Sequence, residues 1–325
     1  MAKEKHSRIR RSSGCLTGCL TRLIALLGFV ALLFVSVHLL GFVHTDQETG
    51  QPVLELGNGS IQIPFDLKNG LNGLPPAFPT WPFGIRSEGM TLKILRAGKG
   101  RALLLCCDGY TAIIGGGSSN YAAGIQMLLC GVNRLDVAIA QSSDKRDTGG
   151  MPFAIRLGKP SYLFYTDTQE RTSHWQDMVE KARRIQCEVP KAGLSFTLGR
   201  GRVTFIGPTR TGHADDVDDS LSLRVDYGSS GILIPGRITR EGETELLASG
   251  AKLSADVLIT NGSREEGATE EAFIAAAAPR IAVCTGDKDS LVIERFKSAG
   301  IEVYPSSEHG IMTIYSDGTE LRMIP

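Results

Sequence analysis

The segment from Leu135 to Gly150 constrains the fold more than any other part of the chain. Val137 to Ala140 form a short, continuous apolar run, which is typical of a buried strand. A polar loop follows and ends at Gly149 and Gly150, just before a second apolar stretch. A strand that carries a polar loop at its carboxyl end is where α/β sheets build their sites. The segment therefore predicts an α/β protein with its chemistry in this loop.

The chain from Met90 onward alternates short apolar runs with segments of helical spacing. The dipeptide Asp108-Gly109 predicts a tight hairpin turn between two strands. Strands are expected at 91–96, 102–107, 111–114, 137–140, 161–165, 187–189, 201–206, 220–225, 231–234, 280–284, 301–304 and 311–315. Helices are expected at 120–131, 173–184, 241–248, 270–277 and 290–299, with a helix-like piece directly after Gly150.

These motifs resemble those of the metallo-β-lactamase fold. Its signature loop reads L-D-x-x-x-x-T-H-x-H-x-D-H-x-G-G, and here the segment 135–150 reads L-D-V-A-I-A-Q-S-S-D-K-R-D-T-G-G. The opening L-R-A-G-K-G-R-A at 95–102 and L-S-A-D-V-L at 253–258 are similar to the extracytoplasmic domain of ComEC/Rec2-type competence proteins. The resemblance implies an αββα four-layer sandwich over residues 90–325.

The positions that hold two metal ions in that family carry other residues here. The resemblance assigns as degenerate metal-site positions Ser142, Asp144, Arg146, Asp147, Arg237, Gly262 and Ser263. Zinc sites are built from histidine, cysteine and carboxylate ligands, and arginine supplies none of these. Zinc, the cofactor of the resembling family, is therefore expected to be absent, and no residue is assigned a catalytic role.

Arginine stands at several positions where the family has functional residues. These arginines are Arg96, Arg101, Arg146 and Arg237. They either converge on the vacated pocket as an anion-binding site, or form salt bridges with Asp144 and Asp147. The residues alone leave both arrangements open.

Two functions from different classes remain. The first is a membrane-anchored pseudoenzyme that acts as a binding or scaffold domain for a protein or a small anionic ligand. The second is an active hydrolase, such as a nuclease or phosphodiesterase, whose metal site has been relocated. Its ligands would come from His213, Asp215, Asp144, Asp147 or His174. Fold alone does not decide between them.

The first 89 residues predict three segments with different roles. Residues 1–22 form a basic tail, and residues 23–43 form an apolar run long enough to span a bilayer as an uncleaved signal-anchor helix. The basic flank predicts a cytoplasmic N-terminus, so the body is expected outside the cytoplasm, on a single-pass protein of the cell membrane. Residues 44–89, rich in proline and glycine, predict a stalk with strand-like pieces at 52–56 and 60–65.

Charge and cysteine usage exclude some classes of protein. Lysine plus arginine equals aspartate plus glutamate at 35 each, but residues 1–45 carry six basic residues and one acidic residue, a balance of +5. The remainder therefore carries −5, which disfavours nucleic acid as the partner. The seven cysteines do not form a recognisable disulfide framework.

Overall fold

The computed structural model describes residues 43–45, 52–56, 59–62, 88–98, 100–166, 168, 172–260, 268–285, 290–309 and 311–324. The chain divides into two units, residues 1–74 and 75–325. The first unit contains a three-stranded antiparallel sheet in the order β1 (Val43–Thr45), β2 (Pro52–Leu56) and β3 (Gly59–Gln62). Strands β2 and β3 correspond to the two strand-like pieces predicted in this part of the chain.

The predicted transmembrane helix at 23–43 lies outside the described residues, apart from Val43, which begins β1. Within the ranges that the structure describes, no helix is both long and apolar enough to cross a membrane. The basic tail and most of the predicted stalk also fall outside these ranges.

The second unit contains an eight-stranded sheet, here the first sheet, in the order β18-β17-β4-β5-β6-β7-β8-β9. Neighbouring strands from β18 to β6 are antiparallel, and those from β6 to β9 are parallel. Asp108 and Gly109 close the β5–β6 hairpin with φ angles of 50° and 86°, as a type I′ turn requires. The strands are β4 (Met90–Ile94), β5 (Leu103–Cys107), β6 (Tyr110–Ile114), β7 (Val137–Ala140), β8 (Tyr162–Tyr165), β9 (Gln186–Glu188), β17 (Met312–Ser316) and β18 (Leu321–Ile324).

The second sheet has seven strands in the order β10 to β16. Strands β10 to β13 are antiparallel, and β13 to β16 are parallel. Parallel neighbours need crossover connections, which the helices between them supply. The strands are β10 (Ser195–Leu198), β11 (Gly201–Gly207), β12 (Ser222–Tyr227), β13 (Ser230–Ile234), β14 (Val257–Thr260), β15 (Ile281–Cys284) and β16 (Glu302–Pro305).

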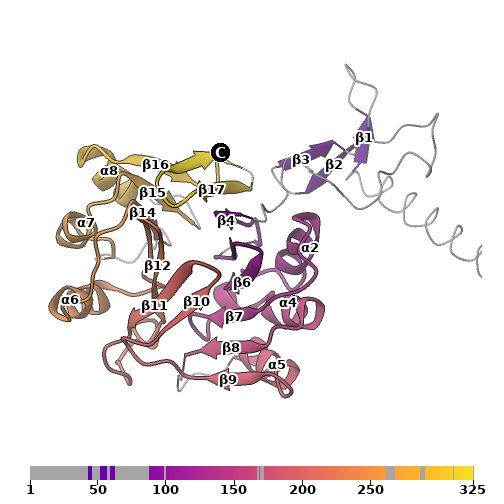
Figure 1. Cartoon of the computed structure of the whole chain (residues 1–325), viewed down its shortest axis with the longest axis horizontal. Helices are drawn as coiled ribbons and strands as arrows, with labels where there is room; N and C mark the ends of the chain where they lie inside the picture. Colours follow the sequence, from indigo (N-terminus) through magenta and orange to yellow (C-terminus); the bar gives the residue numbers. More distant parts are fainter. Residues whose placement is uncertain are drawn as a thin grey trace, which may run out of the picture. The chain divides into compact units, whose positions relative to one another are not determined.

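Helices cover the outer face of each sheet (Figure 1). Those packed on the first sheet are α2 (Ala122–Leu129), α4 (Met151–Gly158) and α5 (Ser173–Lys181). Those packed on the second sheet are α6 (Arg240–Ala248), α7 (Glu271–Ala277) and α8 (Ser290–Ser298). Three separate apolar cores result, one between the sheets and one under each helix layer. This is the αββα four-layer arrangement that the family resemblance implies.

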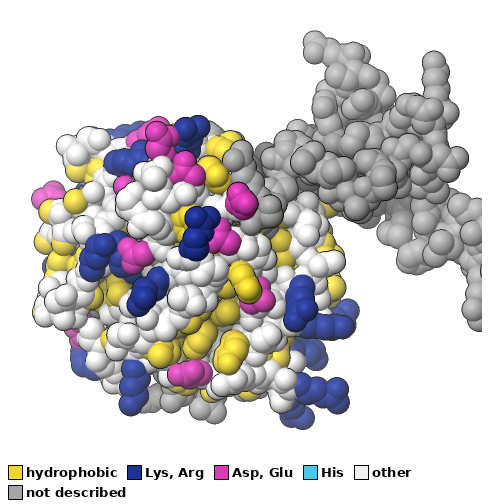
Figure 2. All heavy atoms as spheres, in the orientation of Figure 1, with side chains coloured by type: hydrophobic (Ala, Val, Ile, Leu, Met, Phe, Trp, Pro, Cys, Tyr) yellow, Lys and Arg dark blue, Asp and Glu magenta, His cyan; other side chains and the backbone are white. Residues whose placement is uncertain are grey.

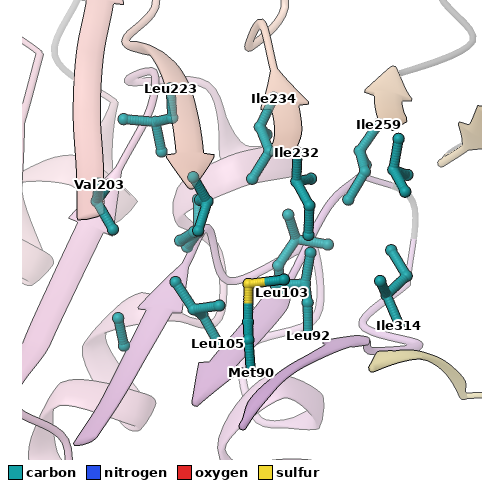
Figure 3. Close-up of a cluster of buried hydrophobic side chains, with 14 of the residues drawn as sticks. Met90, Leu92, Leu103, Leu105, Val203, Leu223, Ile232, Ile234, Ile259 and Ile314 are labelled. Carbon is teal, nitrogen blue, oxygen red and sulfur yellow. The ribbon is translucent and has the colours of Figure 1, made fainter. Parts of the chain in front are cut away.

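The core between the sheets is built from alternate residues of facing strands (Figure 3). Leu103 and Leu105 of β5 face this core together with Leu223 and Ile232 of the second sheet, whereas Leu104 faces the helix layer. Strands covered on both faces are apolar throughout, which explains why their apolar runs are continuous. Burial of each such leucine or isoleucine contributes about 1.5–3 kcal/mol.

Asp108 ties the two sheets together at one end. Its carboxylate accepts hydrogen bonds from the backbone N–H of Gly89 at 3.1 Å and from the Tyr227 hydroxyl at 2.7 Å. Arg200, in the turn between β10 and β11, donates two further hydrogen bonds to this carboxylate, from Nε at 3.0 Å and from Nη2 at 2.8 Å. The Arg200 guanidinium, with the other donors, holds the pKa of Asp108 well below its ordinary value. The β5–β6 hairpin turn is thereby fastened to the second sheet.

Four strands of the structure have no counterpart among the predicted ones: β1, β10, β14 and β18. Strands β10 and β18 are edge strands of four residues with mixed exposure, so neither has the continuous apolar run that marks the buried strands. The L-S-A-D-V-L motif at 253–258 runs into β14, because Val257 to Thr260 pair with neighbouring strands.

Candidate functional site

The loop after β7 folds into a single helical turn, α3 (Lys145–Thr148). Asp144 caps this turn, and its Oδ1 accepts the backbone N–H of Arg146 at 2.6 Å. Gly149 and Gly150 then bring the chain against the loop after β6, since a Cβ on Gly150 would lie 2.4 Å from the carbonyl oxygen of Gly116. The glycine pair is therefore required for close backbone approach, and it places the polar loop at the carboxyl end of the sheet.

Arg101 lies fully buried beside this loop. It belongs to the turn between β4 and β5, and 1% of its surface is exposed. Its Nη2 is 4.0 Å from Oδ1 of Asp147, and its Nη1 donates to the carbonyl oxygen of Gly236 at 3.4 Å. The Ser142 hydroxyl donates to Oδ2 of Asp147 at 2.6 Å. Arg101, Asp147 and Ser142 thus form one buried polar cluster.

Arg237 makes the second ion pair of the same region. It follows β13, is 8% exposed, and its Nη1 lies 2.7 Å from Oδ2 of Asp144. Burial lowers the pKa of Arg101, Asp147 raises it, and the positive charge of Arg237 lowers it further. Because Arg101 donates to the carbonyl oxygen of Gly236, the residue before Arg237, both arginines belong to the same region of the structure. Each is balanced by a different aspartate of the α3 loop.

Hydrogen-bond donors in this cluster are incompletely satisfied. Among the described residues, Nε and Nη2 of Arg101 have no hydrogen-bond acceptor. Oε1 of buried Gln141 likewise has no hydrogen-bond donor within the described part of the chain. The amide nitrogen of Gln141 donates to the carbonyl oxygens of Leu221 and Ile234, which joins β7 to the second sheet. We refer to Arg101, Arg237, Asp144 and Asp147 as the arginine cluster.

The four arginines singled out in the sequence do not all meet. Arg101 and Arg237 lie in the arginine cluster, while Arg146 is half exposed at its rim and pairs with Asp144 at 3.3 Å. The backbone N–H of Arg96 instead donates a hydrogen bond to Oε1 of Gln126 in α2, at 2.7 Å. Gly262 and Ser263 lie outside the described residues. The structure thus shows ion pairs with Asp144 and Asp147 for Arg101, Arg146 and Arg237.

A second cluster of ionisable groups lies at α6. Asp219 Oδ1 is 2.6 Å from Nδ1 of His213, and Glu245 Oε2 is 3.1 Å from Nε2. Burial alone would lower the pKa of His213, but these two carboxylates raise it above its ordinary value. Nε of Arg210 lies 2.6 Å from Oε1 of Glu245, and its Nη2 pairs with Glu241.

His213, Glu241 and Glu245 form a geometric candidate for metal binding. One ligand atom from each lies within 4.8 Å of the others, and this is the one such group found in the described part of the chain. Sequence reasoning selected His213 but missed both glutamates. Their i, i+4 spacing on one helix face was the available signal.

The other residues named for a relocated metal site are scattered. Asp144 and Asp147 belong to the arginine cluster, and Asp215 accepts the N–H of Val217 in its own loop at 3.1 Å. His174 lies on α5, at the margin of a surface cleft. The structure therefore does not bring these residues together with His213 in one site.

Comparison with solved structures places this architecture among known folds. The metallo-β-lactamase fold protein YhfI from Bacillus subtilis is 15% identical, with a TM-score of 0.47, over 66% of this chain and 96% of that chain. Tm1679, described as a metal-dependent hydrolase of the β-lactamase superfamily, is 10% identical, with a TM-score of 0.48, over 66% of this chain and 95% of that chain.

CmlA, a diiron β-hydroxylase from Streptomyces venezuelae, is 10% identical with a TM-score of 0.50. The match covers 70% of this chain and 54% of CmlA, so it spans about half of that protein. By sequence, the chain matches no protein-family model and no curated protein. At 10% identity the likeness to CmlA concerns the fold alone, and the two-sheet α/β architecture of this chain rests on its own strand order.

Proposed function

We propose that the chain is a membrane-anchored protein similar to the ComEC/Rec2-type domain, whose metal site has been replaced and which acts as a non-catalytic binding or scaffold domain. The observation that carries this proposal is the pairing of Arg101 with Asp147 and of Arg237 with Asp144. The body lies outside the cytoplasm, and its partner is a protein or a small anionic ligand rather than nucleic acid.

The residues of the arginine cluster do not fit a metal ion. Nε and Nη2 of buried Arg101 find no hydrogen-bond acceptor among the described residues and are themselves hydrogen-bond donors, whereas metal ligands donate lone pairs. Both aspartates already face a positive charge, so a divalent cation would add uncompensated charge to a buried region. The two guanidinium groups therefore take over the charge balance that cations supply elsewhere in such folds, and no water is activated for hydrolysis.

Metal content and hydrolysis, measured together on the purified full chain, test this proposal. After incubation with zinc or manganese and removal of free metal, we expect less than about 0.1 equivalent of bound ion, because about one equivalent would fill a structural or catalytic site. We also expect no turnover of bis(p-nitrophenyl) phosphate above the buffer rate. One or more bound equivalents that disappear in the variant Asp147→Asn, together with hydrolysis, would sink the proposal.

The alternative, a hydrolase with a relocated metal site, is favoured by one observation only. Asp219 holds Nδ1 of His213, so that Nε2 faces the two glutamates, as second-sphere carboxylates do for metal-bound histidines. Arg210, however, already pairs with both glutamates. Bound metal that is lost in Glu241→Gln but retained in the exposed control Glu320→Gln would establish this alternative site.

A further inference from the structure

A surface cleft lies between the residues just before α2, helix α4 and helix α5. Its volume is about 330 Å³, and its lining includes Tyr121, Phe153, Arg156, His174, Asp177 and Lys181. None of the four residues of the arginine cluster lines it. The volume is at the lower end of the range for small-molecule sites, roughly 300–1,000 Å³, so the cleft has room for one small ligand.

The cleft is positively charged. Arg156 of α4 and Lys181 of α5 are exposed, and the imidazole of His174 also lines the cleft. Asp177 is the one carboxylate in the lining, and its Oδ1 lies 3.2 Å from Nζ of Lys181. Lys and Arg side chains gather over this edge of the molecule, around α4 and α5 (Figure 2). His174 also lies in the first turn of α5, where the helix dipole favours anions.

Two aromatic rings, those of Tyr121 and Phe153, also line the cleft. Tyr121 is 60% exposed. Its ring meets the ring of Phe153 edge to face, with the ring centroids 5.2 Å apart and an angle of 88° between the ring planes. The Arg156 guanidinium lies over the Phe153 ring at 5.6 Å. The position of Phe153 is set by Gly124, where a Cβ would approach the ring to 2.6 Å. An exposed ring beside a held guanidinium is thus present before any ligand arrives.

We propose that this cleft binds a small ligand that combines a phosphate with a planar aromatic ring, of the nucleoside monophosphate class. Arg156 and Lys181 bind the phosphate, because guanidinium and ammonium groups form charge-assisted hydrogen bonds with its oxygens. The planar ring of the ligand lies against Tyr121, whose exposed face offers a stacking surface. The inference goes beyond the proposed function, because it assigns a ligand class to a site that the metal question does not involve.

Isothermal titration of the full chain with three probes tests the two halves of the ligand separately. The probes are AMP, adenosine and inorganic phosphate. We expect AMP to bind at least about tenfold more tightly than either adenosine or phosphate, since each of these keeps only one set of contacts, and tenfold corresponds to about 1.4 kcal/mol. Failure of AMP to bind would overturn the proposal without affecting the metal measurement.

Four variants assign the contacts. Arg156→Gln and Lys181→Gln should each weaken AMP binding about tenfold, and Tyr121→Ala should weaken AMP and adenosine but not phosphate. Asp177→Asn should tighten AMP binding a few-fold (roughly two to five), because it removes the negative charge that pairs with Lys181. The matched control is Arg183→Gln, an exposed arginine just after α5 that does not line the cleft. Equal AMP affinity in the wild type and in both cationic-residue variants would refute the site.

Discussion

Replacing Asp147 by asparagine should destabilise the protein strongly. Asp147 and Arg101 are each 1% exposed, and the carboxylate is 4.0 Å from Nη2 of Arg101. Asparagine keeps an acceptor for the Ser142 hydroxyl but leaves the guanidinium in the interior without its counter-charge. Breaking a buried ion pair by removing one partner costs about 3–5 kcal/mol, and we expect a loss of this size in the free energy of unfolding.

The second half of this prediction is the double variant Arg101→Met/Asp147→Asn. Methionine has a similar length and no charge, so the double variant removes both buried charges together. Its free energy of unfolding should lie within about 1–2 kcal/mol of the wild type, because replacing a whole buried pair by neutral residues is often close to neutral. Together with the second single variant, Arg101→Met, these proteins form a thermodynamic cycle that isolates the coupling between the two side chains.

Equilibrium urea denaturation of the full chain, followed by circular dichroism at pH 7, measures these differences. The control is Arg322→Met, which removes an ion pair between side chains that are 71% and 65% exposed and should leave the urea midpoint unchanged. If the losses in the two single variants simply add in the double variant, the two charges do not depend on each other. The electrostatic account of the arginine cluster would then be wrong.

Two further predictions concern Glu243 and Gly100. Burial raises the pKa of the Glu243 carboxyl to about 7, although the backbone N–H groups of Glu270 and Thr269 favour its charged form. The folded state therefore keeps a proton that the unfolded state releases at about pH 4.3. The free energy of unfolding should fall as the pH rises from that value to about 7. Glu243→Gln should reduce the difference between urea midpoints at pH 5 and pH 8; an unchanged difference would contradict this. Gly100→Ala should cost more than about 2 kcal/mol in urea denaturation, because φ is +109° and the new Cβ would lie 2.1 Å from the carbonyl oxygen of Arg146. Gly193→Ala, with φ of +93° and no atom within 4 Å of its Cβ, separates backbone strain from this clash and should cost about 1–2 kcal/mol.

Much of the layered fold was accessible from local sequence patterns. The apolar runs at Val137 to Ala140 and Ile281 to Cys284 became central strands, because a strand covered by helices on one face and a sheet on the other is apolar throughout. The Asp108-Gly109 turn was predicted for a similarly local reason, since both residues tolerate positive φ. Edge strands β10 and β18 escaped prediction, because their four residues carry no continuous apolar run.

The candidate site was only partly accessible in this way. The α3 loop was identified from its position after a buried strand, and its aspartates are indeed ion-paired with arginines. The sequence did not distinguish Arg96, which α2 holds through its backbone, from Arg101, which is buried beside Asp147. The cleft between three helices also left no motif in the chain.

The sequence by itself determined the buried apolar strands, the Asp108-Gly109 turn and the polar loop after β7, because those features follow from the residue pattern within a few positions. Only the tertiary structure decided which charges meet. Arg101 and Arg237 are far apart in the chain, and they approach each other because the turn after β4 and the end of β13 reach the same edge of two facing sheets. The apolar core between the sheets fixes how the two sheets pack, and this packing brings the polar groups together. The apolar residues of that core do not indicate in the sequence which polar groups will meet.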